Sequence, residues 1–141
     1  MNEPSVIEEM LRTSKTIAVV GMSDRDTRAS YHIGKYLAQN GYRVFPVNPR
    51  VQTVLGMKCY PDLEAAGKAA QEQNGMGIDL VDVFRAPEHV PAIVDDVIRL
   101  GIRNLWLQDG VVHHEAVAKA EAAGVKCVQN DCIYRRHAQM F

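Results

Sequence analysis

The sequence lacks the features that would place it in a membrane, in the secretory pathway or on nucleic acid. Its 141 residues contain no apolar run approaching the roughly 20 residues that a membrane span requires. The first residues, MNEPSVIEEM, are acidic and contain no apolar segment of the kind found in signal peptides. A net charge of −1 provides no broad basic field for sequence-independent binding to nucleic acid. We therefore expect neither a membrane nor a nucleic acid as a partner, and the sequence does not tell whether there is a protein partner.

Cysteine is also scarce. Cys59, Cys127 and Cys132 are an odd number at wide spacing, which indicates neither a disulfide framework nor a structural zinc site. Free thiols are typical of a reducing compartment, so we expect a cytoplasmic protein. Cys132 lies near the end of the last expected strand and is a candidate reactive thiol.

The sequence shows no catalytic arrangement. His113, His114 and Glu115 stand side by side at the start of an expected helix, where neighbouring side chains diverge, so we expect a solvated turn and not a metal site. His32 and His89 have no evident partner for general-base catalysis. Because no Ser-His-Asp, Cys-His or paired-carboxylate arrangement stands out, we do not expect an enzyme.

Short apolar runs alternate with helical patterns along the whole chain. Residues 17–20 are all apolar, as in a strand that is buried on both faces of a parallel sheet. Strands are expected at residues 16–20, 42–47, 78–84, 104–107 and 126–128, with a further short strand around 57–60. Helices are expected near residues 5–12, 31–40, 62–73, 90–98, 114–123 and 133–139.

A Gly-apolar-basic joint recurs at residues 41–43, 101–103 and 124–126, each time between an expected helix and the next strand. Glycine suits the left-handed position that ends a helix, and the apolar residue can pack back on the last turn. Strands and helices alternating through such short joints predict βαβ units and a parallel sheet.

We therefore predict an α/β fold: one Rossmann-like, doubly wound domain over residues 1–141, with its core at about 15–133. Its sheet should be mostly parallel, with five to six strands, helices on both faces and the strand order 3-2-1-4-5. In such folds ligands bind at the carboxyl ends of the strands, where the order reverses.

The loop after the first expected strand has the character of an anion-binding turn. Gly21 permits a sharp turn and close approach of the backbone to a ligand. Ser23 adds a hydroxyl group, Arg28 adds positive charge, and the next helix points its free N–H groups at the loop. Neither G-x-G-x-x-G nor G-x-x-x-x-G-K-[ST] is present. We favour phosphate or nucleotide binding here over a ligand-free turn.

The loop after the second expected strand argues against a standard dinucleotide site. Such sites place an acidic residue about 20 residues beyond the glycine turn, to bind the ribose 2′-hydroxyl. This chain has Val47-Asn48-Pro49-Arg50 there. Asn48 can form hydrogen bonds, Pro49 offers a flat apolar surface and Arg50 can pair with a phosphate. NADP and coenzyme A both satisfy this pattern, and a plain turn with a solvated arginine remains the alternative.

The loop after the third expected strand begins with Phe84 and Arg85. An arginine at the carboxyl end of a strand is well placed for a pyrophosphate, whereas Phe84 fits the site and the core equally well. Because Pro87 and Pro91 cannot both lie deep in one regular helix, the first turn of the following helix should be irregular.

Two runs are more specific than the rest: GYRVFPVNP at residues 41–49 and DVFR at residues 82–85. Together with AVVGMS (18–23), RASY (28–31), LGMKCY (55–60), LWLQDG (105–110) and DCI (131–133), they resemble the CoA-binding domain family. Its members are small, stand-alone bacterial and archaeal proteins similar to the amino-terminal domain of the succinyl-CoA synthetase α subunit.

The resemblance implies a Rossmann-like fold that binds coenzyme A or an acyl-CoA in one cleft. It implies that Gly21, Met22 and Ser23 wrap the phosphates, that Val47, Asn48, Pro49 and Arg50 hold the adenosine end, and that Phe84, Arg85 and Val90 line the remaining wall. The chain departs from the pattern at Ala29, where relatives often carry proline, and at Asp109, an acidic residue beside an anionic ligand.

The leading hypothesis is non-enzymatic binding of coenzyme A or an acyl-CoA, by a sensor or a carrier. Synthetases with this domain add a second one that carries a phosphorylated histidine, so the resemblance does not extend to their activity. The alternatives are an NADP-dependent enzyme that uses the same cleft, and a regulatory or scaffolding module without a ligand.

Overall fold

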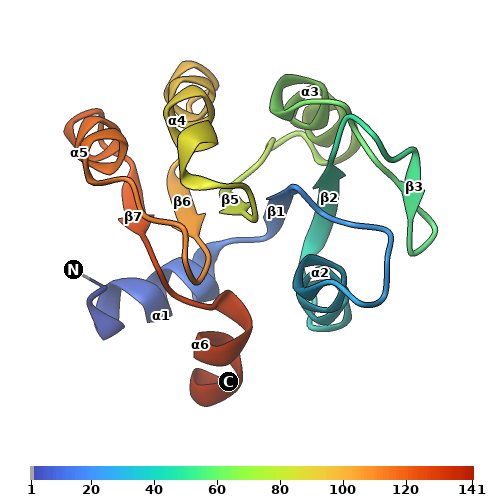
Figure 1. Cartoon of the computed structure of the whole chain (residues 1–141), viewed down its shortest axis with the longest axis horizontal. Helices are drawn as coiled ribbons and strands as arrows, with labels where there is room; N and C mark the ends of the chain where they lie inside the picture. Colours follow the sequence, from blue (N-terminus) through green and yellow to red (C-terminus); the bar gives the residue numbers. More distant parts are fainter. Residues whose placement is uncertain (1) are drawn as a thin grey trace.

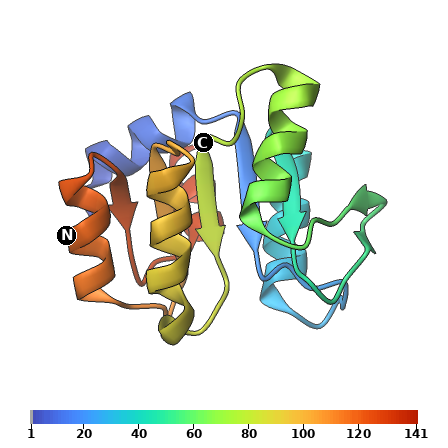
Figure 2. The same ribbon diagram turned by 90° about the horizontal axis from the view of Figure 1, so that it is seen from above.

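The computed structural model describes residues 2–141 and contains a central sheet of five parallel strands (Figures 1 and 2). The strands are β1 (Thr16–Val20), β2 (Arg43–Val47), β5 (Leu80–Val83), β6 (Asn104–Leu107) and β7 (Lys126–Val128). All of them run in the same direction, and they lie in the order β2-β1-β5-β6-β7. The predicted α/β class with a parallel sheet is confirmed.

Helices cover both faces of the sheet (Figure 1). One face carries α1 (Pro4–Thr13), α2 (Ala29–Gln39) and α6 (Ile133–Met140). The other carries α3 (Leu63–Asn74), α4 (Val90–Arg99) and α5 (His114–Ala122). Among the described residues, no helix combines the length and the apolar character needed to cross a bilayer.

Strand β1 contributes side chains to two apolar cores, one on each face of the sheet. Ile17 and Val19 belong to the cluster with α1, α2 and α6, whereas Ala18 and Val20 belong to the cluster with α3, α4 and α5. Successive side chains of a strand point to opposite faces, so an all-apolar run supplies both cores. All five residues of β1 are buried, as predicted.

The strand order corrects one expectation. Numbered along the chain, the five parallel strands lie in the order 2-1-3-4-5, so the expected order 3-2-1-4-5 is wrong for them. All four residues of β5 are buried, which suits a central strand between β1 and β6, whereas β2 begins with an exposed residue, as an edge strand can. The place beyond β2 is taken by Tyr60, which forms a single parallel bridge with Val47.

The Gly-apolar-basic joints end three helices as predicted. Their glycines, Gly41, Gly101 and Gly124, have φ between 69° and 93°. The N–H of the next residue donates to the carbonyl five residues earlier, as in Tyr42 to Leu37 at 3.2 Å, which is the Schellman arrangement. Each strand therefore starts directly after a helix, with no room for a long loop.

One short strand differs in extent from the prediction. The short strand expected around residues 57–60 is only Met57–Lys58 (β4), and it pairs antiparallel with Thr53–Val54 (β3) in a separate hairpin. The irregular start expected for α4 is confirmed, because a 3-10 helix at Pro87–His89 precedes it.

Candidate functional site

The loops that follow β1, β2 and β5 meet at one edge of the sheet, where the strand arrowheads in Figure 2 point. The Gly21 N–H donates to the Val47 carbonyl at 2.8 Å, and the Phe84 N–H donates to the Val20 carbonyl at 2.9 Å. The chain leaves β1 toward β2 and later returns to the other side of β1 as β5. This is the switch point at which doubly wound sheets bind ligands.

Two adjoining cavities open at this edge, with volumes of about 340 and 350 Å³. They share Gly21 and Asn48, and together they include eight of the residues predicted from the sequence. The first cavity is lined by Gly21, Asn48, Pro49, Arg50 and Arg85. The second is lined by Gly21, Ser23, Arg28, Ala29, Ser30, Asn48 and Phe84.

The side chains of Met22, Val47 and Val90 lie in the core beneath the cleft and not on its surface. The Met22 side chain is fully buried against α2, where a Cβ added to Gly34 would lie 2.3 Å from Met22 Cε. Of the predicted site residues, these three therefore shape the floor of the cleft, and only their backbone groups are left to meet a ligand.

Gly21 is the tightest point of the site. Its φ of 87° lies in the left-handed region, which residues other than glycine rarely adopt. A Cβ at this position would lie 3.0 Å from the Phe84 carbonyl oxygen and 3.0 Å from Arg85 Cδ. The turn after β1 thus packs directly on the end of β5, and glycine is required for both reasons.

Asn48 ties two of the loops together. Its Nδ2 donates to the Met22 carbonyl at 3.1 Å, and its Oδ1 accepts from the Arg50 N–H at 3.0 Å. An amide carries two N–H donors and two acceptor lone pairs, so one donor and one lone pair remain for a ligand. The role expected from the sequence was contact with the ligand, and the structure adds the fixing of the first two loops.

Ser30 is a lining residue that the sequence analysis did not single out. It lies in the first turn of α2, and its Oγ accepts from the Ser23 N–H at 2.9 Å. The Ser23 Oγ in turn accepts from the Arg25 N–H at 3.0 Å. Both hydroxyl groups keep their own hydrogens for donation. A serine in the first turn of a helix that follows a glycine loop is the signal that could have identified it.

The cleft concentrates positive charge. Arg28, Arg50 and Arg85 come from three different loops, and over residues 2–141 none of them forms an ion pair with a carboxylate. By contrast, Arg99 pairs with Glu64 and Asp96 on the surface. Guanidinium groups without an acidic partner around a cavity are suited to binding phosphate or carboxylate groups.

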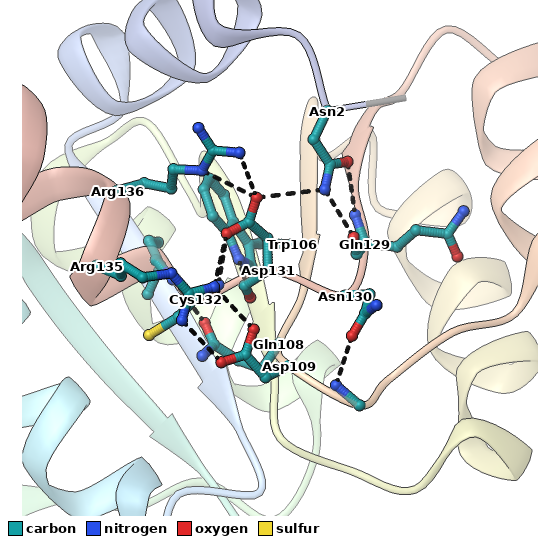
Figure 3. A network of polar contacts seen from close by, with 12 residues as sticks. Asn2, Trp106, Gln108, Asp109, Gln129, Asn130, Asp131, Cys132, Arg135 and Arg136 are labelled. Carbon is teal, nitrogen blue, oxygen red and sulfur yellow. Dashed lines mark hydrogen bonds and ion pairs between the residues drawn. The ribbon is translucent and has the colours of Figure 1, made fainter.

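Asp109 is the acidic residue that the sequence placed beside an anionic ligand. Its carboxylate forms an ion pair with α6 (Figure 3). Both of its carboxylate oxygens accept from Arg135 of α6 at 3.0 Å. Arg135 and Arg136 also bind Asp131, which precedes α6. The charge of Asp109 is thereby balanced within the protein.

His113 and Cys132, two other candidates from the sequence, have positions that the fold itself explains. The His113 Nδ1 accepts from the Ala116 N–H at 3.0 Å, so this histidine caps α5. Cys132 is buried at the start of α6 and lines neither cavity. Across the part of the chain that the structure describes, no group of three or more His, Cys, Asp or Glu side chains is arranged to bind a metal.

Comparisons with known proteins find one family model and several similar chains. A family model described as a CoA binding domain matches residues 15–138. The chain is 36% identical over 140 residues to the uncharacterized protein YneT of Bacillus subtilis, with 98% of each chain covered. It is 27% identical over 135 residues to an ADP-forming acetate–CoA ligase of Archaeoglobus fulgidus, covering 89% of this chain but 18% of the ligase. A solved structure, a hypothetical protein from Pyrococcus horikoshii OT3, is 36% identical, with a TM-score of 0.87 and coverage of 99% of this chain and 92% of the other.

Proposed function

Because the chain belongs to the CoA binding domain family, we infer that it binds coenzyme A or an acyl-CoA in the cleft at the ends of β1, β2 and β5. The observation that carries the proposal is the set of three arginines around the Gly21 turn for which the described residues provide no acidic partner. Coenzyme A has a pyrophosphate and a 3′-phosphate, and these anionic groups are separated along the molecule. The cleft has cationic groups in two adjoining cavities, which fits such a ligand.

In this proposal each part of the ligand has its own residues. Arg50, in the loop after β2, pairs with the ribose 3′-phosphate, and Pro49 packs on the adenosine. Arg28 and Arg85 bind the pyrophosphate across the Gly21 turn, where the absence of a side chain lets phosphate oxygens approach the backbone. Ser23 and Ser30 add hydroxyl donors from the second cavity.

We propose a binding role, as a sensor or a carrier, and not catalysis. The side chains around the two cavities are those of Asn, Pro, Arg, Ser, Ala and Phe. General acid–base or nucleophilic catalysis normally uses a histidine, carboxylate, cysteine or activated hydroxyl with a neighbouring base. The residues that line the cavities therefore favour binding of a charged nucleotide over catalysis of a reaction.

Thermal unfolding with added ligand tests the proposal. Ligand at about 100 times Kd stabilises a folded protein by about 2.7 kcal/mol, so Tm should rise with the concentration of coenzyme A. NADP should give a smaller shift, and Arg50→Ala should weaken coenzyme A more than dephospho-CoA, which lacks the 3′-phosphate. No shift of Tm with millimolar coenzyme A would overturn the proposal, and equal losses for the two ligands would remove the assignment of Arg50.

A further inference from the structure

Arg85 is held at both ends of its side chain. Its Cδ packs against Gly21, at 3.0 Å from the position that a Cβ would occupy. Its Nη2 lies 3.1 Å from Nε2 of His89, within hydrogen-bonding distance. The guanidinium group is therefore fixed at the wall of the first cavity, which it lines together with Arg50.

His89 is itself placed by the irregular start of α4. It ends the 3-10 helix Pro87–His89, and its N–H donates to the Ala86 carbonyl at 2.9 Å. The next residue, Val90, is fully buried and begins α4. Proline at the start of the turn restricts the backbone, so the imidazole leaves the main chain at a defined point beside Arg85.

The chemistry of this contact differs from that of an ion pair. A guanidinium is always protonated in proteins and only donates, so the Nε2 of His89 is the acceptor and the ring proton lies on Nδ1. A neutral imidazole fixes the guanidinium without cancelling its charge, as a carboxylate would. One of the five N–H groups of Arg85 is used, and the rest stay available to an anion.

We propose that His89 is a positioning residue that holds the Arg85 guanidinium, fully charged, for the pyrophosphate of coenzyme A. The proposal rests on the proposed function for the identity of the ligand, and on the Arg85–His89 contact for the role of the histidine. A flexible arginine loses rotamer freedom when it binds a ligand, and an arginine that is already ordered loses less. His89 thus acts on affinity through Arg85, without touching the ligand.

Affinity for coenzyme A, measured by calorimetry on the full chain, tests this role. His89→Ala should bind roughly two- to tenfold more weakly, the range expected for one side chain that must be ordered on binding. His89→Gln keeps an acceptor oxygen and should recover part of the loss. In an Arg85→Ala background, His89→Ala should change the affinity no further, because the residue through which it acts is gone. An unchanged affinity of His89→Ala, or the same loss in both backgrounds, would overturn the proposal.

A second measurement needs neither ligand nor variant. The ¹⁵N chemical shifts of His89 in the wild-type protein report its tautomer, and we expect the proton on Nδ1. A proton on Nε2 would contradict the contact with Arg85 and overturn the inference. Failure of the wild-type protein to bind coenzyme A would overturn the proposed function and with it the ligand assigned to Arg85, and the NMR result would show separately whether the contact exists.

Discussion

At the scale of single residues, Gly21 links the geometry of the fold to the proposed binding of coenzyme A. Gly21→Ala should abolish detectable binding of coenzyme A. The added Cβ blocks the approach of the phosphates to the backbone and displaces the Arg85 side chain. It should also destabilise the protein by about 1–3 kcal/mol, since an alanine at φ 87° is strained and its Cβ meets the Phe84 carbonyl. Denaturant unfolding and a binding titration measure the two effects.

Gly67→Ala is the matched control for this substitution. Gly67 lies within α3, and a Cβ there would meet nothing within 4 Å. Alanine in a helix interior is favoured over glycine by roughly 0.5–1 kcal/mol, so this variant should be slightly stabilised and should bind normally. Wild-type stability and binding in Gly21→Ala would show that the turn has room for a side chain.

Asp82 gives a second prediction at this scale. It is fully buried in β5, and among residues 2–141 its carboxyl oxygens have no hydrogen-bond partner. Burial raises the pKa of Asp82 well above its ordinary value, so the folded protein holds a proton that the unfolded chain releases above pH ~4. The free energy of unfolding should therefore fall as the pH rises from ~4 toward the raised pKa.

Asp82→Asn removes the titrating group with little change in volume. Its unfolding free energy should lack this decline, so the variant should gain stability relative to wild type as the pH increases. Urea unfolding at several pH values between 4 and 9 measures the difference. Parallel curves for the two proteins would mean that Asp82 does not hold a proton in the folded state.

At the scale of elements, the carboxylate of Asp131 holds the first turn of α6 (Figure 3). This carboxylate accepts from Arg136 at 2.9 Å, from Arg135 at 3.1 Å and from the Cys132 N–H at 2.9 Å. Burial acts to raise the pKa of Asp131, but the hydrogen bonds and charge of Arg136, with the other two donors, outweigh it and lower the pKa. The stabilisation is therefore present above the unfolded-state pKa and is lost as the pH falls through the folded-state value.

Asp131→Asn should lower the free energy of unfolding by about 1–3 kcal/mol at pH 7, because charged donors lose their partner. The difference from wild type should shrink as the solution is acidified, which chemical unfolding at pH 7 and at pH 3 would detect. Asp95→Asn is the control, since its ion pair with Lys119 is exposed and such pairs contribute about 0–1 kcal/mol. Equal effects of the two substitutions would show that α6 does not depend on Asp131.

The helices and strands could be predicted from local sequence patterns. The order of the strands in the sheet could not. The glycine joints at 41, 101 and 124 marked where helices end, because that information is local. The position of β5 next to β1 depends on contacts between residues far apart in sequence, such as Asp82 beside Val19. The Asp109–Arg135 pair, 26 residues apart, likewise has no local signal.

At the scale of the whole molecule, the parallel sheet explains why the cleft residues could be predicted from the sequence to lie together. The carboxyl ends of parallel strands share one edge, so the loops after β1, β2 and β5 must meet once the topology is known. Eight predicted residues line the two cavities there. Ser30 was missed although its place in the first turn of α2 is a local signal. The Arg85–His89 contact could not be predicted, because it depends on side-chain directions within a turn.

The most direct test of the central claim is a crystal structure of this protein with coenzyme A. The proposed mode of binding places the pyrophosphate against the Gly21 turn with Arg85 and Arg28, and the ribose 3′-phosphate beside Arg50. Coenzyme A bound away from the ends of β1, β2 and β5, or with its phosphates remote from all three arginines, would contradict it.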